Sequence, residues 1–150
     1  MLLALGTITA QQASATQATS RYVTHLLDYF HTHPDAKLRY HGSDMILHIH
    51  SDASYNSEAK ARSQDGGHFY LGKNASVRTT MHNNGAILKT STIMRNVMES
   101  ASEAECGALF NNTKEAVALR TTLHEMGHPQ PPHPRRGRQL NHCWVCKQAN

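Results

Sequence analysis

The segment from Asp44 to Ala53 constrains the fold most, because its apolar and polar side chains alternate. Alternation with a period of two is typical of a β-strand that buries one face. The pattern predicts a strand with one face on a core and with Asp52 at its end. Its two faces are Met45, Leu47 and Ile49 on one side, and Ile46, His48, His50 and Asp52 on the other.

Short strand patterns and turn residues precede and follow this segment. Gly42-Ser43 separates it from an earlier strand pattern, and residues 54–67, rich in Ser, Lys and Asp, predict a loop. Asn83-Asn84-Gly85 is turn material between the last two patterns. The strands from Asp44 onward predict an antiparallel meander. The other predicted strands are Lys37–Tyr40, His68–Leu71 and Ala86–Ser91.

An amphipathic helix is predicted before the strands. Residues Gln11–His33 contain few helix breakers, and Pro34 disfavours helical backbone in the residue before it. The apolar residues recur at helical spacing, so one face must dock on a partner surface. They are Val23, Leu26, Leu27 and Phe30.

A second, longer helix is predicted to begin near Ser100. Ser100 and Glu103 match the capping box, in which each side chain satisfies an otherwise unpaired amide of the first turn. Gly127 and Pro129 end the helix, and Asn111-Asn112 predicts a joint inside it. The expected buried side is Ala104, Ala108, Ala116, Leu119, Leu123 and Met126.

Composition limits the class of protein. A chain of 150 residues with 39% hydrophobic residues has room for one globular core. No segment approaches the roughly 20 apolar residues of a membrane span. Met1–Leu5 lacks the basic flank of a secretory signal, and three cysteines do not make a disulfide framework, so we expect an intracellular protein with reduced thiols and no membrane partner. The net charge of +4 admits a polyanionic partner.

The character of the chain changes at Pro129. The last segment, 129–150, is rich in Pro, Gly, Arg and Lys and has no apolar period, which predicts an exposed, disordered tail. We therefore divide the chain into an N-terminal helical segment, 1–43, a domain, 44–128, and this tail.

Two acidic motifs stand out, one at the end of the first strand of the meander and one in the long helix. Together with their flanking residues they resemble the ribonuclease H domain, in the version found in copia-type retrotransposon polyproteins. The similarity spans about Leu5 to Pro132, and residues 5–42 look like the end of a reverse transcriptase region. The matching segments are Asp44–Ile49, Ser51–Tyr55, Ala101–Glu105, Gly107–Phe110 and Glu125–Pro131.

The resemblance implies a fold, a reaction and two site residues. The fold would be an incomplete ribonuclease H-like α/β domain: a three-stranded antiparallel meander plus a long helix, preceded by an N-terminal helix. The reaction is hydrolysis of the RNA strand of an RNA:DNA hybrid with two Mg²⁺ ions held by carboxylates. Asp52 and Glu105 match the strand aspartate and the helix glutamate that bind metal and serve catalysis, while Glu103 serves the helix cap. A polymerase part of the same polyprotein would be a further partner.

The chain departs from this family where a third carboxylate is expected, after the long helix. Arg138–Asn141 stands in place of an Asp-Asn-Ser-Thr stretch. A nucleotide sequence that encodes residues 138–150 can encode Asp-Asn-Ser-Thr-Thr-Ala-Gly-Tyr-Val-Asn-Lys-Gln in the next frame. We hypothesise that the tail after about Pro132 is out of frame, and we expect weak or absent nuclease activity from a truncated domain.

Three other interpretations stay open. His124-Glu125-Met126-Gly127-His128 matches the H-E-x-x-H pattern of zinc metalloproteases, although Gly127 and Pro129 break the helix that this motif needs. His142–Cys146 contains a single C-x-x-C, an incomplete zinc ligand set. Lys60, Arg62 and the basic tail could bind nucleic acid without cleaving it.

Overall fold

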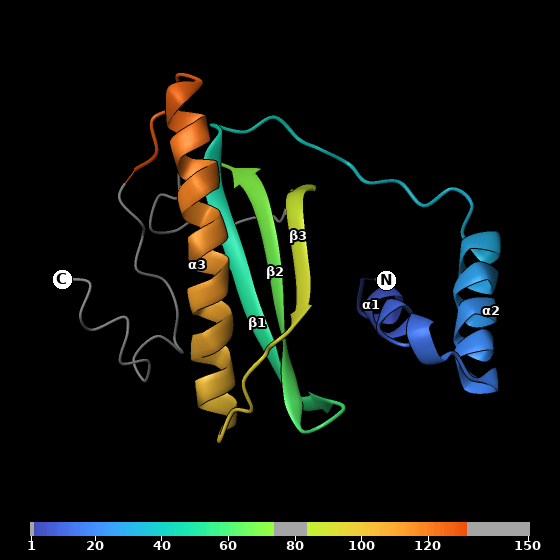
Figure 1. Cartoon of the computed structure of the whole chain (residues 1–150). Helices are drawn as coiled ribbons and strands as arrows, with labels where there is room; N and C mark the ends of the chain where they lie inside the picture. Colours follow the sequence, from blue (N-terminus) through green and yellow to red (C-terminus); the bar gives the residue numbers. More distant parts are fainter. Residues whose placement is uncertain (1, 74–83, 132–150) are drawn as a thin grey trace. The chain divides into compact units, whose positions relative to one another are not determined.

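The computed structural model describes residues 2–73 and 84–131, and the chain forms two compact units (Figure 1). The first unit is Met1–Leu38 and the second is Arg39–Asn150. The second unit is a mixed α/β structure, a three-stranded antiparallel sheet with one long helix. No helix in the described residues is both long enough and apolar enough to span a membrane.

The first unit consists of short helices. Helix α1 covers Leu2–Ala10, a 3-10 turn covers Gln12–Ser14, and α2 covers Gln17–Thr32. The prediction of one helix over 11–33 is therefore wrong at its beginning. Thr16 ends the preceding segment and caps α2, because its hydroxyl accepts from the Thr19 amide and the Thr19 hydroxyl accepts from the Thr16 amide.

The apolar stripe predicted for α2 exists and is solvent-exposed within this unit. Leu27 is 60% exposed, Phe30 48% and Val23 38%. The expectation that this face docks on a partner surface stays a prediction.

The sheet of the second unit is a meander in the order β1-β2-β3. Its antiparallel strands are β1, Ile46–Glu58, β2, Arg62–Gly72, and β3, Ala86–Ile93. The predicted loop over 54–67 is wrong: most of it continues β1 and β2, which are joined by a turn at residues 59–61. Lys60 and Ala61 have φ angles of 63° and 51°, so left-handed backbone closes a turn without glycine.

The strand predicted at Lys37–Tyr40 is also wrong. These residues are neither helical nor in a strand. Instead, the Tyr40 hydroxyl donates to the Ala86 carbonyl oxygen over 3.0 Å, and the His41 amide donates to the Asn84 side-chain oxygen over 2.8 Å. The Asn84 side-chain amide also donates to the His41 carbonyl oxygen over 3.0 Å. This segment is therefore anchored beside the beginning of β3 by side-chain hydrogen bonds rather than by a ladder.

Helix α3, Ala101–Glu125, lies along one face of the sheet, next to β1 (Figure 1). The predicted cap is confirmed, since the Glu103 amide donates to the Ser100 hydroxyl over 3.1 Å. The Glu103 carboxylate accepts from the Glu99 amide, one residue before the predicted one. The helix is continuous through Asn111-Asn112, so the predicted joint is wrong. Met126, predicted to be buried, is 64% exposed.

The core between α3 and the sheet is apolar at one end and polar in the middle. Leu47, Phe69, Ala116 and Leu123 form its buried cluster. Asn112 is 2% exposed and reaches across to the sheet. Its amide nitrogen donates to the Ser51 hydroxyl and the Gly66 carbonyl oxygen, and its oxygen accepts from the Thr90 hydroxyl, at distances of 2.9, 3.0 and 2.9 Å.

The chain after α3 turns back along β1. The Gly127 amide donates to the His124 carbonyl oxygen and the His128 amide to that of Leu123, with Gly127 at a φ of 88°, which is a Schellman motif. Gln130, inside the predicted tail, then bonds to β1. Its side chain accepts from the Leu47 amide and donates to the Met45 carbonyl oxygen, both over 2.9 Å.

Candidate active site

Asp52 lies on β1, on the face of the sheet opposite α3. The strand continues past it to Glu58, with an irregularity between Ser54 and Glu58, so Asp52 does not end the strand as predicted. Its side chain is exposed, and its partner in the β2 register is Gly66. A carboxylate at this position is therefore accessible to a ligand.

Glu105 lies near the beginning of α3 and is half-buried. Burial raises the pKa of its carboxyl group, and the negative charge of Asp52 raises this pKa further. A hydrogen bond from the Ala53 backbone acts in the opposite direction. The two carboxylates that were predicted as a pair thus lie close enough to repel each other, although they belong to different elements.

Helix capping separates the roles of the two neighbouring glutamates. The Glu103 carboxylate is bound to the Glu99 amide at the helix beginning. Glu105, two residues later, lies on another side of the helix and meets the edge of β1 at Ala53. The structure therefore agrees with the assignment of Glu103 to the cap.

The pair lies at the outer edge of β1, the edge that does not pair with β2. In an antiparallel strand, alternate residues direct their amide and carbonyl groups to the same edge. The Leu47 amide points outward to Gln130 and the Ala53 backbone points outward to Glu105, which fits this parity. Glu105 comes near this edge because α3 packs against β1 and the Ala53 backbone bonds to the Glu105 carboxylate.

The described residues supply two carboxylates to this site. No group of three or more His, Cys, Asp or Glu side chains within residues 2–73 and 84–131 is arranged to hold a metal ion. The position predicted to lack the third carboxylate, Arg138–Asn141, lies outside the described residues. The out-of-frame hypothesis for the tail therefore stays a prediction.

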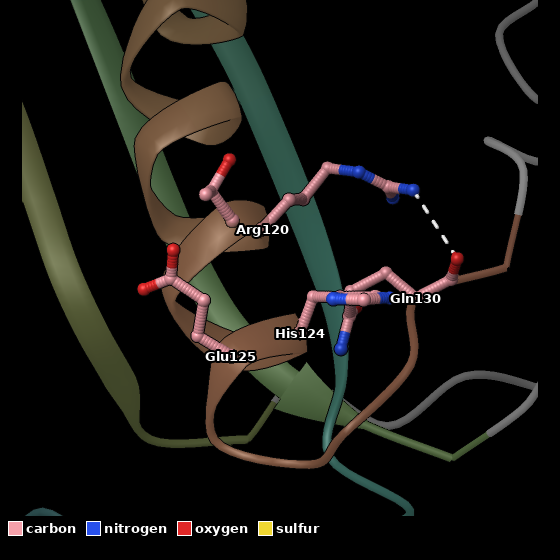
Figure 2. A pocket seen from close by; sticks show the side chains of 5 residues that line it. Arg120, His124, Glu125 and Gln130 are labelled. Carbon is pink, nitrogen blue, oxygen red and sulfur yellow. Dashed lines mark hydrogen bonds between the residues drawn. The ribbon is translucent and has the colours of Figure 1, made fainter.

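The H-E-x-x-H residues are divided by the end of α3. Helix α3 stops at Glu125, and His128 is the residue that closes the Schellman motif. His124 and Glu125 line a surface pocket with Arg120, Thr121 and Gln130. The side chains of His124 and Glu125 point to different sides of the helix end (Figure 2). The Arg120 guanidinium donates to the Gln130 and Pro131 carbonyl oxygens over 3.5 and 2.8 Å. His124 and His128 therefore do not lie one turn apart on a continuous helix, as the H-E-x-x-H zinc motif requires.

The other predicted sites lie partly outside the residues that the structure describes. His142–Cys146 belongs to residues that the structure does not describe. Lys60 is exposed in the β1–β2 turn, and Arg62 begins β2 with its side chain donating to the Ala59 carbonyl oxygen over 3.4 Å. Cys106, which follows Glu105 on α3, is half-buried.

A second aspartate, Asp65 on β2, was not predicted from the sequence. It is 2% exposed and faces α3. Its carboxylate accepts from the Thr92 hydroxyl, from the Thr92 amide over 3.2 Å and from the Asn111 side chain over 2.7 Å. Because these donors already satisfy Asp65, we assign it to stability rather than to the site. The pattern Asn111-Asn112 in a helix was the available signal.

Comparisons with known proteins give no family for this chain. No protein-family model, no curated protein and no solved structure matches it.

Proposed function

We propose that residues 44–128 are a ribonuclease H-like domain from a copia-type polyprotein, in which Asp52 and Glu105 bind a divalent cation. The observation that supports this proposal is the electrostatic coupling of the two carboxylates: the negative charge of Asp52 adds to burial in raising the pKa of Glu105. The residues were chosen from the sequence alone, and they come from a strand and a helix. The N-terminal segment would then be the end of a reverse transcriptase region, and an RNA:DNA hybrid the substrate.

The donor set fits one Mg²⁺ ion better than two. Mg²⁺ prefers oxygen ligands and is commonly held by one or two carboxylates, with water or substrate phosphate in the other positions. Asp52 offers an exposed carboxylate, and Glu105 is held toward it by the Ala53 backbone. When bound, the cation would supply activation of a water molecule and stabilisation of the leaving oxygen.

Two carboxylates also explain why we expect weak or absent hydrolysis. In two-metal sites the ions are about 3.5 to 4 Å apart and need a larger cluster of ligands. Asp65 cannot complete this cluster, because its carboxylate already accepts hydrogen bonds from Thr92 and Asn111. We therefore propose a remnant nuclease that keeps cation binding and has lost most of its turnover.

Thermal unfolding with and without divalent cations tests the site. A cation that binds only the folded chain raises the melting temperature according to its concentration relative to its Kd. We expect Mn²⁺ and Mg²⁺ to raise the melting temperature of the full chain and to have no such effect on Asp52→Asn or Glu105→Gln. Glu115→Gln, an exposed carboxylate on α3, is the matched control. An equal rise in Asp52→Asn and the wild-type chain would show that the cation binds elsewhere.

Hydrolysis is measured separately with a labelled RNA:DNA hybrid. We expect little cleavage by the full chain in Mg²⁺. Fast cleavage that Asp52→Asn abolishes would show that the site is complete and that the proposed loss of activity is wrong.

A further inference from the structure

The face of the sheet opposite α3 carries a row of imidazole and ammonium groups. In the strand register His50 lies beside His68, and His68 lies beside Lys89, so one row crosses all three strands. His50 and Lys89 are exposed, and His68 is half-buried. The contacts of α3 are made on the other face, with Ser51, Asp65 and Thr90 among others.

Tyr70 lies beneath this row and holds the imidazoles in place. It is 2% exposed, and the rings of His48 and His50 stack on it with centroids 5.4 and 5.5 Å away. The tilted ring of His68 is 5.4 Å away. Hydrogen bonds fix the three imidazoles further: His50 Nε2 to the Tyr70 hydroxyl at 3.2 Å, His48 Nε2 to the Lys73 carbonyl oxygen at 3.1 Å, and His68 Nε2 to the Asn84 carbonyl oxygen at 3.3 Å.

The next row leaves space between these rings and the carboxylate site. It consists of Asp52, Gly66 and Ser91. A Cβ atom on Gly66 would meet one atom within 4 Å, the Asp52 carbonyl oxygen at 3.8 Å. Packing therefore does not require glycine at this position. Gly67 differs, because a Cβ there would collide with Asn112 and Thr90.

We propose that this face binds single-stranded nucleic acid, with bases stacked on His50 and His68 and phosphate near Lys89. Imidazoles on a sheet surface are common stacking partners of unpaired bases, and a lysine beside them attracts the phosphate backbone. Asp52 is the one acidic side chain in the rows that begin at His48, His50 and Asp52. The choice of a nucleic acid as ligand rests on the proposed function, and the row would deliver one strand to the space above Gly66, next to Asp52.

Fluorescence anisotropy of a labelled oligouridine of 12 nucleotides tests this proposal. The full chain is titrated in EDTA, so that the cation site does not contribute. We expect His68→Ala to raise the Kd about fivefold or more, the lower range for loss of one stacking contact. Lys89→Gln should lower the slope of log Kd against log salt by about 0.7, the value for one phosphate contact on a single strand.

Matched variants on the other side of the sheet control for net charge. Lys114→Gln and His124→Ala change exposed residues on α3 and should leave the Kd within about twofold. If Lys114→Gln and Lys89→Gln weaken binding equally, the attraction is unspecific and the proposal is wrong. Equal affinity for a 12-base-pair DNA duplex, which is not the proposed substrate, would also contradict it.

Gly66→Val provides a test that does not remove a charge or a ring. It fills the space between Asp52 and Ser91, and we expect a rise in Kd of about threefold or more with an unchanged urea midpoint, on the order of one lost stacking contact. An unchanged Kd in Gly66→Val and His68→Ala would overturn the proposal.

Failure of this proposal is distinguishable from failure of the proposed function. Asp52→Asn should abolish stabilisation by Mn²⁺ and leave oligouridine binding in EDTA unchanged or tighter, because it removes a negative charge beside the strand. Oligouridine binding without any Mn²⁺ effect would leave this face as a binding surface and reject the cation site. A Mn²⁺ effect without oligouridine binding would reject the face alone.

Discussion

The carboxylates on the two faces of the sheet have opposite surroundings. On the face covered by α3, Asp65 is 2% exposed and accepts hydrogen bonds from Thr92 and Asn111. On the face opposite α3, which we call the open face, Asp52 is exposed, and its negative charge acts on another carboxylate, that of Glu105. Both aspartates belong to adjacent strands of one hairpin, so fold position alone does not distinguish them.

The two aspartates differ in the groups that surround their negative charge. A buried carboxylate is tolerated when donors surround it, and it then contributes to stability. Two neighbouring carboxylates repel each other, which raises the pKa of Glu105 and favours a bound cation. The covered face is therefore built for stability, and the edge of β1 next to the open face is suited to binding.

Neighbouring aromatic residues on β2 give the strongest test of this comparison. Phe69 is fully buried under α3, and Phe69→Ala should lower the free energy of unfolding by about 3 to 5 kcal/mol. Tyr70→Phe on the other face loses one hydrogen bond to His50 and should cost about 1 kcal/mol. Urea unfolding measures both. A loss in Tyr70→Phe as large as that in Phe69→Ala would contradict this ranking.

The two aspartates themselves sharpen the comparison. Asp65→Asn places amide hydrogens against the donors of Thr92 and Asn111, and should cost about 2 kcal/mol of unfolding free energy. Asp52→Asn should change stability by less than about 0.5 kcal/mol at pH 7, since the side chain is exposed. Both variants are isosteric, so each is the control of the other. A larger loss in Asp52→Asn would contradict the assignment.

Local patterns in the sequence were sufficient for some elements. The Ser100 cap needs residues three apart, and the alternation at residues 45–52 needs one strand, so both were predicted. The prediction of a loop over 54–67 was wrong because its polar residues indicated a solvent-exposed segment. Asp65 and Gln64 are in fact buried, with partners such as Thr92 and Ser91 that are distant in the sequence.

The candidate site shows the same limit. Asp52 and Glu105 were chosen by resemblance, and the structure brings them together. Gln130 could not be predicted, because its role depends on the Schellman turn that returns the chain to Leu47. The row formed by His50, His68 and Lys89 depends on strand register. This register could not be predicted from the residue types of the three strands.

Gln130 tests the edge of β1 at the end away from the carboxylates. Gln130→Ala removes bonds to the Leu47 amide and the Met45 carbonyl oxygen and should cost about 1 to 2 kcal/mol. Hydrogen exchange should become faster at the Leu47 amide and stay unchanged at Ala53. Gln130→Glu keeps the acceptor and loses the donor, so it should retain part of the protection at Leu47. Unchanged exchange at Leu47 would show that Gln130 does not hold this edge.

The smallest predicted effect concerns Glu105 and pH. Burial and the Asp52 charge raise its pKa above the ordinary value of 4.5, so the folded chain binds this proton more tightly than the unfolded chain does. The stability from this group is full below pH 4.5 and is lost as pH rises through the folded-state pKa. Glu105→Gln should therefore be more stable than wild type at pH 7, by less than about 1 kcal/mol, because the pair is partly solvated.

This difference should disappear at pH 4, where Glu105 is protonated. It should become smaller, without disappearing, in Asp52→Asn, because burial is the larger cause of the raised pKa and the Asp52 charge is the second. Thermal unfolding between pH 4 and 8 in EDTA measures it, with Glu115→Gln as the control. Saturating Mg²⁺ should reverse the order at pH 7, since only the wild-type pair would then have a cation between its carboxylates. A stability gain in Glu105→Gln that does not depend on pH would mean that side-chain packing, rather than charge repulsion, distinguishes the edge of β1 from the covered face.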